Sequence, residues 1–230
     1  MSDNAQSTEN AHAQPVYVWD IPTRLFHWSL VIAVATSLFT SEFGPMDLHM
    51  ISGHVVLALL LFRLVWGIAG GRHARFASFV RGPSAVIAYA RGMMSGNTSA
   101  HLGHNPMGGW SVLAIITLLA IQVATGLYAN DDILTEGPLA STVSKSTSDF
   151  MTYIHHLASN GVYALICLHL AAVAFYTFKG HKIIRAMISG RTTDVGGDDA
   201  GENSGASGSL VLALVSIAVA GAIAYWVLNF

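Results

Sequence analysis

Five long apolar stretches constrain this chain more than any other feature of its sequence. Each has about the 20 residues that a helix needs to cross a hydrocarbon core about 30 Å thick. The composition agrees, because 53% of the 230 residues are apolar and only 10% are charged, whereas soluble domains carry about 25% charged residues. We therefore predict an all-α integral membrane protein with spans at 25–43, 48–70, 109–129, 153–178 and 209–228.

Polar segments between the spans indicate how the chain is organised. We expect a disordered tail at 1–18, a four-helix transmembrane domain at 19–191, a flexible Gly-, Ser- and Asp-rich linker at 192–208, and a C-terminal transmembrane helix at 209–230. The polar segment 71–108 is expected to include a short surface helix over residues 83–94.

The basic residues predict the orientation of the spans. With five spans, the segments 71–108 and 178–191 share a side with the N-terminus, and of the 11 basic residues only Lys145 lies on the other side. Cytoplasmic loops carry the excess of Lys and Arg. We therefore expect a multi-pass protein of the bacterial inner membrane with a cytoplasmic N-terminus, a periplasmic C-terminus and a periplasmic acidic loop at 130–152.

Two histidines of the fourth span, His155 and His169, lie on one face of its helix. They are fourteen residues apart, which at 100° per residue is about 40° short of four full turns. The rise of 1.5 Å per residue separates them by roughly 21 Å along the axis, so one lies near each side of the membrane. One helix therefore offers a ligand-type side chain to each leaflet.

Two further histidines lie at matching depths. His27 is at the cytoplasmic start of the first span and His49 at the periplasmic start of the second, which predicts the pairs His27/His169 and His49/His155. Two imidazoles from facing helices suit the axial positions of a haem iron, whereas zinc needs three or four converging ligands. The single cysteine, Cys167, excludes a C-x-x-C-H site for covalent haem. The prediction is two non-covalent, bis-histidine haem b groups, and a proton relay or metal-transport route is the main alternative.

Three other residues are secondary candidates for cofactor binding, each with a simpler structural explanation. Arg63 shares the helical face of His49, and Arg24 lies one turn before His27. Either arginine could pair with a haem propionate or extend to the membrane interface. Gly53, one turn after His49, would let a flat macrocycle lie close to the backbone, but ordinary helix packing also explains it.

The remaining histidines are not expected to bind iron. His54 is about 140° round its helix from His49, and His156 is about 140° from His169. The histidines of the polar segments are expected to be solvated, namely His73, His101, His104 and His181.

Five motifs follow one another in a characteristic order: WDIPTRLFHW, DLHMISGHVVLALLLFRLVWG, FVRGPSAVIAYARG, LGHNPMG and HHLASNGVYALICLH. Together they resemble the bacterial cytochrome b561 family over residues 16–191, and most closely the b-type cytochrome subunits of membrane-bound nickel-iron hydrogenases. The resemblance implies a four-helix bundle with two b haems, whose axial ligands fall on His27, His49, His155 and His169. The chain departs from the family in two ways: His54 stands where an aromatic or apolar residue is expected, and the fifth span lies outside the four-helix core.

The resemblance also implies a function in transmembrane electron transfer. The chain would relay electrons between a periplasmic redox protein, hydrogenase-like or multihaem, and the membrane quinone pool, as a subunit of a respiratory oxidoreductase rather than a stand-alone enzyme. An oligomer is compatible with this function, and no nucleic-acid partner is expected. The alternatives are a self-contained quinone oxidoreductase acting on a small molecule such as superoxide, and a membrane anchor or transporter whose histidines bind no haem.

Overall fold

The computed structural model describes residues 15–96, 102–193 and 207–230. Within these residues, five helices are long and apolar enough to cross a membrane: α1 Ile21–Phe43, α2 Met46–Ala69, α5 Pro106–Gly126, α6 Lys145–Phe178 and α8 Leu210–Leu228. Each coincides with one of the apolar stretches in the sequence. The predicted all-α membrane fold is therefore confirmed.

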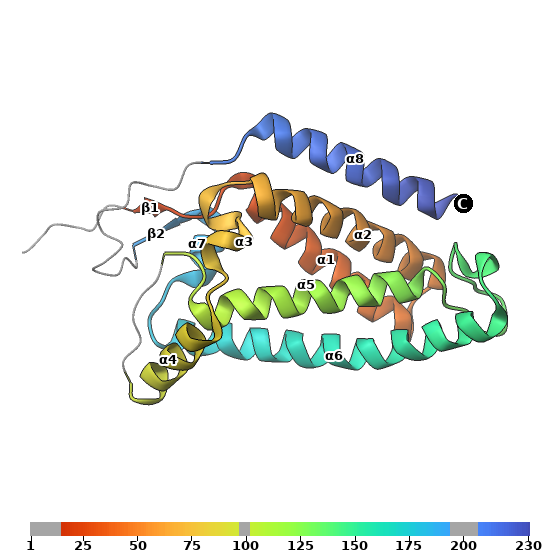
Figure 1. Cartoon of the computed structure of the whole chain (residues 1–230), viewed down its shortest axis with the longest axis horizontal. Helices are drawn as coiled ribbons and strands as arrows, with labels where there is room; N and C mark the ends of the chain where they lie inside the picture. Colours follow the sequence, from red (N-terminus) through yellow and green to blue (C-terminus); the bar gives the residue numbers. More distant parts are fainter. Residues whose placement is uncertain (1–14, 97–101, 194–206) are drawn as a thin grey trace, which may run out of the picture.

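The first four of these helices form two antiparallel hairpins (Figure 1). Helix α1 packs on α2, α5 packs on α6, and the hairpins meet mainly where α2 contacts α5. Helix α8 packs along α2 on the outside of the bundle. The result is the predicted four-helix bundle with a fifth, C-terminal helix. Helix α1, which carries His27, and helix α6, which carries His155 and His169, belong to different hairpins.

Local sequence signals set the starts of the helices. Asp20 caps α1 by accepting a hydrogen bond at 2.9 Å from a backbone N–H three residues on, and Asn105 caps α5 in the same way at 2.7 Å. A proline follows each cap within two positions, where its missing N–H does no harm. Helix α6 begins at Lys145, after a Ser144 cap and well before the apolar stretch. Its first turns are polar because they extend beyond the expected bilayer.

One end of the bundle, here called the basic end, is closed by small elements. They are the 3₁₀ turn Arg72–Ala74, α3 Phe76–Phe79, α4 Pro83–Met94, α7 Ile183–Ser189, and the antiparallel strands β1 Val16–Tyr17 and β2 Arg191–Thr192. Helix α4 has the predicted bounds. Strand β1 falls at the end of the expected tail, and its pairing with β2 ties that segment to the end of the four-helix region. Residues 1–14 of the tail and 194–206 of the expected linker lie outside the described residues.

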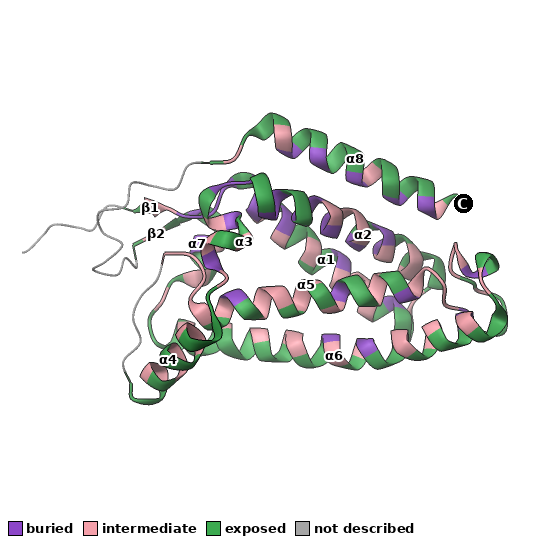
Figure 2. Cartoon of the chain, viewed as in Figure 1, coloured by how far each residue is buried: buried purple, intermediate pink, exposed green. Residues whose placement is uncertain are grey.

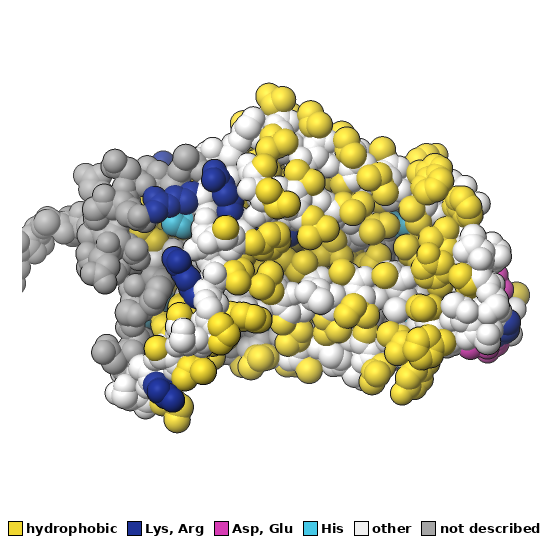
Figure 3. Space-filling view, viewed as in Figure 1, with side chains coloured by type: hydrophobic (Ala, Val, Ile, Leu, Met, Phe, Trp, Pro, Cys, Tyr) yellow, Lys and Arg dark blue, Asp and Glu magenta, His cyan; other side chains and the backbone are white. Residues whose placement is uncertain are grey.

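The opposite end, here called the acidic end, consists of the connection 127–144 and the first turns of α6. It carries Asp131, Asp132, Glu136 and Asp149, and Lys145 forms ion pairs with Asp132 and Asp149. Figure 3 shows Asp and Glu side chains at this end, most of the visible Lys and Arg side chains at the basic end, and a largely hydrophobic surface between them. This distribution suits a protein whose middle is surrounded by lipid and whose ends face water.

The core is centred on α2, which has the largest buried share of the spanning helices (Figure 2). Leu59, Leu60 and Phe62 are buried, and Trp66 is fully buried, with its indole N–H donating to the Thr23 hydroxyl of α1 at 3.2 Å. Helix α6 has the smallest buried share of the five. The helix that carries two of the candidate ligands is thus the one least held by protein packing.

Candidate functional site

Two of the candidate histidines meet near the acidic end of the bundle. His49 of α2 and His155 of α6 have ring centroids 6.2 Å apart, with the rings at 82° to each other. The Nδ1 atom of each ring lies 2.9 Å from a backbone carbonyl oxygen, that of Ser37 for His49 and that of Gln122 for His155. A carbonyl oxygen can only accept, so Nδ1 is the protonated nitrogen in both rings. Both Nε2 atoms therefore keep the lone pair that a metal ligand needs.

The surroundings of His155 are closely fitted to its ring. A Cβ atom at Gly126 would lie 2.9 Å from Cε1 of His155, so only glycine lets the ring sit against α5 at this level. The side-chain amide of Gln122 donates to Nε2 of His155 at 3.0 Å, while its Oε1 atom is buried without a hydrogen-bond partner among the described residues. An iron at Nε2 would displace this amide. Gly126 was not among the residues predicted from the sequence, although a glycine at the depth of a candidate ligand is a usable signal.

The other two histidines lie near the basic end. His27 of α1 and His169 of α6 are close enough for their charges to interact. The His27 ring packs against the edge of Trp28 with centroids 5.0 Å apart, and its Nδ1 atom is buried with no hydrogen-bond partner in the described part of the chain. In contrast to the acidic-end pair, no backbone carbonyl of the described residues is hydrogen-bonded to Nδ1 of His27.

Arg63 of α2 is buried near the same end of the bundle, against the ring of Phe26, the residue before His27. Its side chain is only 3% exposed, its guanidinium carbon lies 4.6 Å from the centre of the Phe76 ring, and the rings of Phe26 and Phe79 lie within about 6 Å. One guanidinium nitrogen, Nη1, has no hydrogen-bond partner among the described residues. The arginine therefore does not extend to the interface, which was the simpler explanation of its position.

Arg24 and Gly53, the remaining candidates, have different surroundings. Arg24 donates from Nη1 to the carbonyl oxygen of Ile188 at 2.5 Å, which ties α1 to the end of α7. A Cβ atom at Gly53 would meet nothing within 4 Å, so open space lies beside the backbone of α2 one turn after His49. That space agrees with the prediction that a flat group could approach the backbone there.

The histidines that were not expected to bind iron divide into three groups. His156 is exposed on α6. His54 is buried, with Nδ1 2.7 Å from the carbonyl oxygen of Met50 and Nε2 unpartnered within the described ranges. His101 lies outside the described residues, and His73 and His181 are partly buried.

The expectation that His104 is solvated is wrong. Its ring packs between Trp19, with centroids 4.8 Å apart, and Phe79, at 4.6 Å, and its Nδ1 atom is buried without a hydrogen-bond partner among the described residues. Trp19 lies just before α1 and Phe79 at the end of α3, so two segments distant in sequence cover the ring. Burial, followed by the positive charge of Arg63, lowers the pKa of His104 to about 3, so its imidazole is neutral at pH 7.

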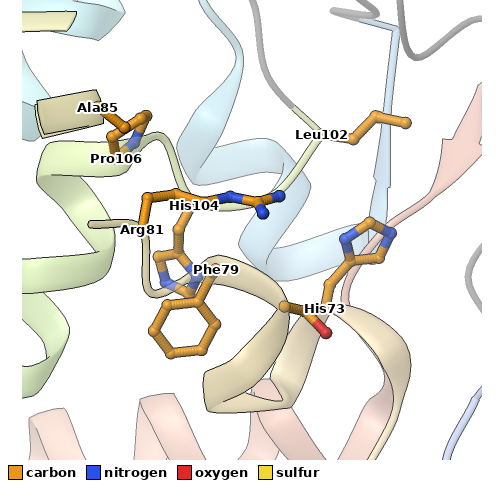
Figure 4. Close-up of a pocket in the computed structure, with 8 residues that line it drawn as sticks. His73, Phe79, Arg81, Ala85, Leu102, His104 and Pro106 are labelled. Carbon is orange, nitrogen blue, oxygen red and sulfur yellow. The ribbon is translucent and has the colours of Figure 1, made fainter. Parts of the chain in front are cut away.

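A cavity of about 260 Å³ opens at the basic end, and His104 lines it. Its other polar lining residues are His73, Ser78 and Arg81, and none of the described residues that line it is an Asp or Glu. Figure 4 shows that these side chains come from separate segments and that the His104 ring lies against Phe79. The cavity therefore brings the aqueous face of the basic end up to the His104 ring.

The acidic-end pair fits an iron bound between two imidazoles. With metal–nitrogen bonds of about 2 Å, two Nε2 ligands on opposite sides of a metal would place their ring centroids roughly 6 Å apart. The observed separation is 6.2 Å. The described residues contain no group of three or more His, Cys, Asp or Glu side chains that could hold a metal ion by themselves. The residues present thus suit a flat metal complex that brings its own equatorial ligands.

Comparisons with known proteins agree with this geometry. A family model described as prokaryotic cytochrome b561 matches residues 18–190. The chain is 22% identical to the probable Ni/Fe-hydrogenase B-type cytochrome subunit of Rhizobium leguminosarum bv. viciae, over 83% of this chain and 94% of the relative. It is also 22% identical to the protein of that name from Cupriavidus necator, over 84% and 93%. The probable Ni/Fe-hydrogenase 1 B-type cytochrome subunit of Escherichia coli (strain K12) is 23% identical over 48% and 58%.

The family match covers all four spans of the bundle and all four paired histidines, and it ends just before β2. The five candidate membrane spans of the described residues agree with a helical membrane bundle of this family. The chain belongs to the prokaryotic cytochrome b561 family.

Proposed function

We propose that this chain binds two haem b groups and conducts electrons across the membrane from one to the other. The observation that carries the proposal is the His49/His155 pair, whose rings come from different hairpins and have centroids 6.2 Å apart. In both rings Nδ1 lies against a backbone carbonyl oxygen, which leaves the lone pair on Nε2. His27 and His169, which lie at matching depths near the basic end, are the axial ligands of the second haem. Residues 19–191 form the haem domain, and α8 is an accessory helix outside it.

The secondary candidates take different roles in this proposal. Arg63, buried near the basic end with a nitrogen unpartnered in the described part of the chain, binds a propionate of the basic-end haem. Gly53 leaves room for the acidic-end macrocycle. Arg24, bound to the Ile188 carbonyl oxygen, keeps α7 in place below His27 rather than contacting haem.

The names of the relatives support a partner as well as a cofactor. They are b-type cytochrome subunits of Ni/Fe-hydrogenases, so we expect a hydrogenase-like or multihaem redox protein to exchange electrons with this chain. The basic end faces the cytoplasm by the positive-inside rule, which makes the acidic end periplasmic and the partner a periplasmic protein. Membrane quinone is the proposed exchange partner near the basic end.

The acidic-end loop offers a surface for that partner. Asp131 accepts hydrogen bonds from the backbone N–H groups of Ile133, Leu134 and Thr135 at 2.8–2.9 Å, which holds the turn. The turn presents Ile133 and Leu134 outwards, 82% and 92% exposed, next to the acidic side chains of the same loop. A partner with an apolar pocket surrounded by basic residues fits this surface.

The two sites also suggest a direction of electron flow. Donation from Nδ1 to a carbonyl makes an imidazole more electron-rich and favours ferric iron, which lowers the potential of the acidic-end haem. A buried guanidinium beside the basic-end haem disfavours the extra positive charge of ferric iron, which raises its potential. Electrons would therefore pass from the periplasmic partner to the acidic-end haem, then to the basic-end haem and quinone.

A pyridine haemochrome assay on the detergent-purified protein tests the cofactor proposal. We expect two b haems per chain in the wild type, one in His49→Ala and one in His27→Ala. His156→Ala and His54→Ala are matched controls that should keep both haems. A folded wild-type protein without haem would contradict the proposal and favour the membrane anchor or transporter, and two haems in His49→Ala would remove that ligand assignment.

A further inference from the structure

Four buried nitrogen atoms without a hydrogen-bond partner lie near the basic end. They are Nε of Arg24, Nδ1 of His27, Nη1 of Arg63 and Nδ1 of His104, within the part of the chain that the structure describes. Buried polar groups in proteins are almost always hydrogen-bonded, because leaving one unpaired costs about 1–3 kcal/mol and more for a charged group. Several such atoms in one region indicate that a polar ligand completes it.

His104 and Arg63 are held against the same aromatic ring. The His104 ring centroid is 4.6 Å from that of Phe79, and the Arg63 guanidinium carbon is 6.0 Å from it. The Arg63 guanidinium carbon also lies 5.9 Å from the centre of the Phe26 ring, next to His27 in the sequence. A loop histidine and a spanning arginine therefore reach the region of the proposed axial pair from two different segments.

The chemistry of this region points to a carboxylate ligand. Arg63 can only donate hydrogen bonds, and a neutral imidazole donates from its protonated nitrogen. Asp20 is the acidic residue that interacts electrostatically with Arg63, but the two side chains form no ion pair in the described residues. Asp20 Oδ1 instead caps α1 and lies 3.4 Å from the indole nitrogen of Trp66. The other oxygen of Asp20, Oδ2, is buried without a hydrogen-bond partner among the described residues, so it does not bond to Arg63 either. Nη1 of Arg63 therefore remains available to the carboxylate of a ligand.

We propose that His104, together with Arg63, binds the propionate groups of the haem held by His27 and His169. The inference rests on the proposed function, since it needs a haem at the basic end. His104 acts here as a cofactor-binding and positioning residue rather than an iron ligand. Trp19 and Phe79 hold its ring in place before haem binds, so little side-chain freedom is lost on binding.

The test compares two substitutions of His104 in full-length chains that each retain a single haem. His104→Phe keeps a ring between Trp19 and Phe79 but removes both nitrogen atoms, whereas His104→Gln restores a donor. In a His49→Ala background, which retains only the basic-end haem, His104→Phe should release haem to excess apomyoglobin about tenfold faster, as expected for losing a hydrogen bond to a charged group. It should also lower the reduction potential of that haem, and His104→Gln should reverse most of both changes.

Two controls distinguish the loss of a hydrogen bond from His104 from a general loss of structure. In a His27→Ala background, which retains only the acidic-end haem, His104→Phe should change neither haem release nor potential. His73→Leu, in the same cavity wall, should leave the basic-end haem unchanged.

The possible results separate this inference from the proposed function. Unchanged release and potential in His104→Phe would overturn the inference, and so would equal damage to both haems or a failure of His104→Gln to restore binding. A wild-type chain without haem would instead overturn the proposed function, so the two failures are distinguishable.

Discussion

The two histidine pairs differ in what prepares them for a cofactor. At the acidic end, both rings are oriented by hydrogen bonds from Nδ1 to carbonyl oxygens of Ser37 and Gln122. At the basic end, His27 has no such bond within the described residues, but Arg63 and His104 supply buried donors nearby. In the proposed arrangement, the acidic-end site is therefore organised around the axial ligands. The basic-end site is organised around the propionate edge of the haem. Two haems of the same chemical type can therefore differ in potential through the protein alone.

The largest expected effect is the loss of haem from the acidic-end site alone. Gly126→Val places side-chain atoms against the His155 ring, because even a Cβ there would lie 2.9 Å from Cε1. We expect the haem content to fall from two per chain to one, with an overpacking penalty of about 1–3 kcal/mol in unfolding free energy. Gly221→Ala, where a Cβ meets nothing within 4 Å, is the matched control. Retention of both haems in Gly126→Val would show that His155 tolerates displacement and would weaken the ligand assignment.

The second prediction changes the basic-end site through charge. Arg63→Leu removes the buried cation, so the potential of the basic-end haem should fall by about 60 mV, which is tenfold in a one-electron equilibrium. Arg63→Lys should retain part of the shift. A redox titration followed in the visible spectrum measures both haems at once. A fall of equal size at the acidic-end haem would mean that the guanidinium acts on the whole bundle, and the contrast between the sites would be lost.

The third prediction is a smaller change in haem affinity at the acidic-end site. Gln122→Met removes the amide that donates to Nε2 of His155 and the buried Oε1 atom without a partner in the described residues. It leaves the backbone carbonyl that orients the ring. Haem affinity at this site should rise a few-fold, since a competing hydrogen bond of about 1 kcal/mol is gone. Haem transfer in the His27→Ala background measures it, and weaker binding would mean that the amide assists haem instead of competing with it.

The smallest expected effect concerns the partner-facing loop. Backbone N–H groups, chiefly those of Thr135 and Ile133, hold the pKa of Asp131 at about 2, below its ordinary value of 3.8. Because the folded pKa is the lower one, the turn is stabilised above about pH 4 and loses this stabilisation as pH falls towards 2. Hydrogen exchange of the Ile133, Leu134 and Thr135 amides should therefore show protection at pH 5 that Asp131→Asn reduces slightly. Equal protection in both proteins would assign the rigidity of the turn to its backbone alone.

The sequence predicted the helices well because their signals are local. The length of each span and the start of the surface helix at Pro83 depend only on neighbouring residues. Pairing by depth also placed His49 with His155 correctly in space, although their axial ligation stays a prediction. The acceptors on Ser37 and Gln122 are backbone carbonyls, which any residue could provide, so no residue type could reveal them. His104 was misjudged because its burial comes from Trp19, a residue distant in sequence.

The modest packing of α6 has a consequence for how the protein is made. The helix carries one candidate ligand of each pair, yet it is the least buried span, and α1 and α2 supply the opposite ligands from the other hairpin. Two hairpins can enter the bilayer independently, as helical membrane proteins generally do before their helices associate. In the proposed arrangement, each haem would then link one hairpin to the other through its two axial histidines. Haem supply during biosynthesis would therefore set how much of the newly inserted chain matures and how much is left for proteolysis.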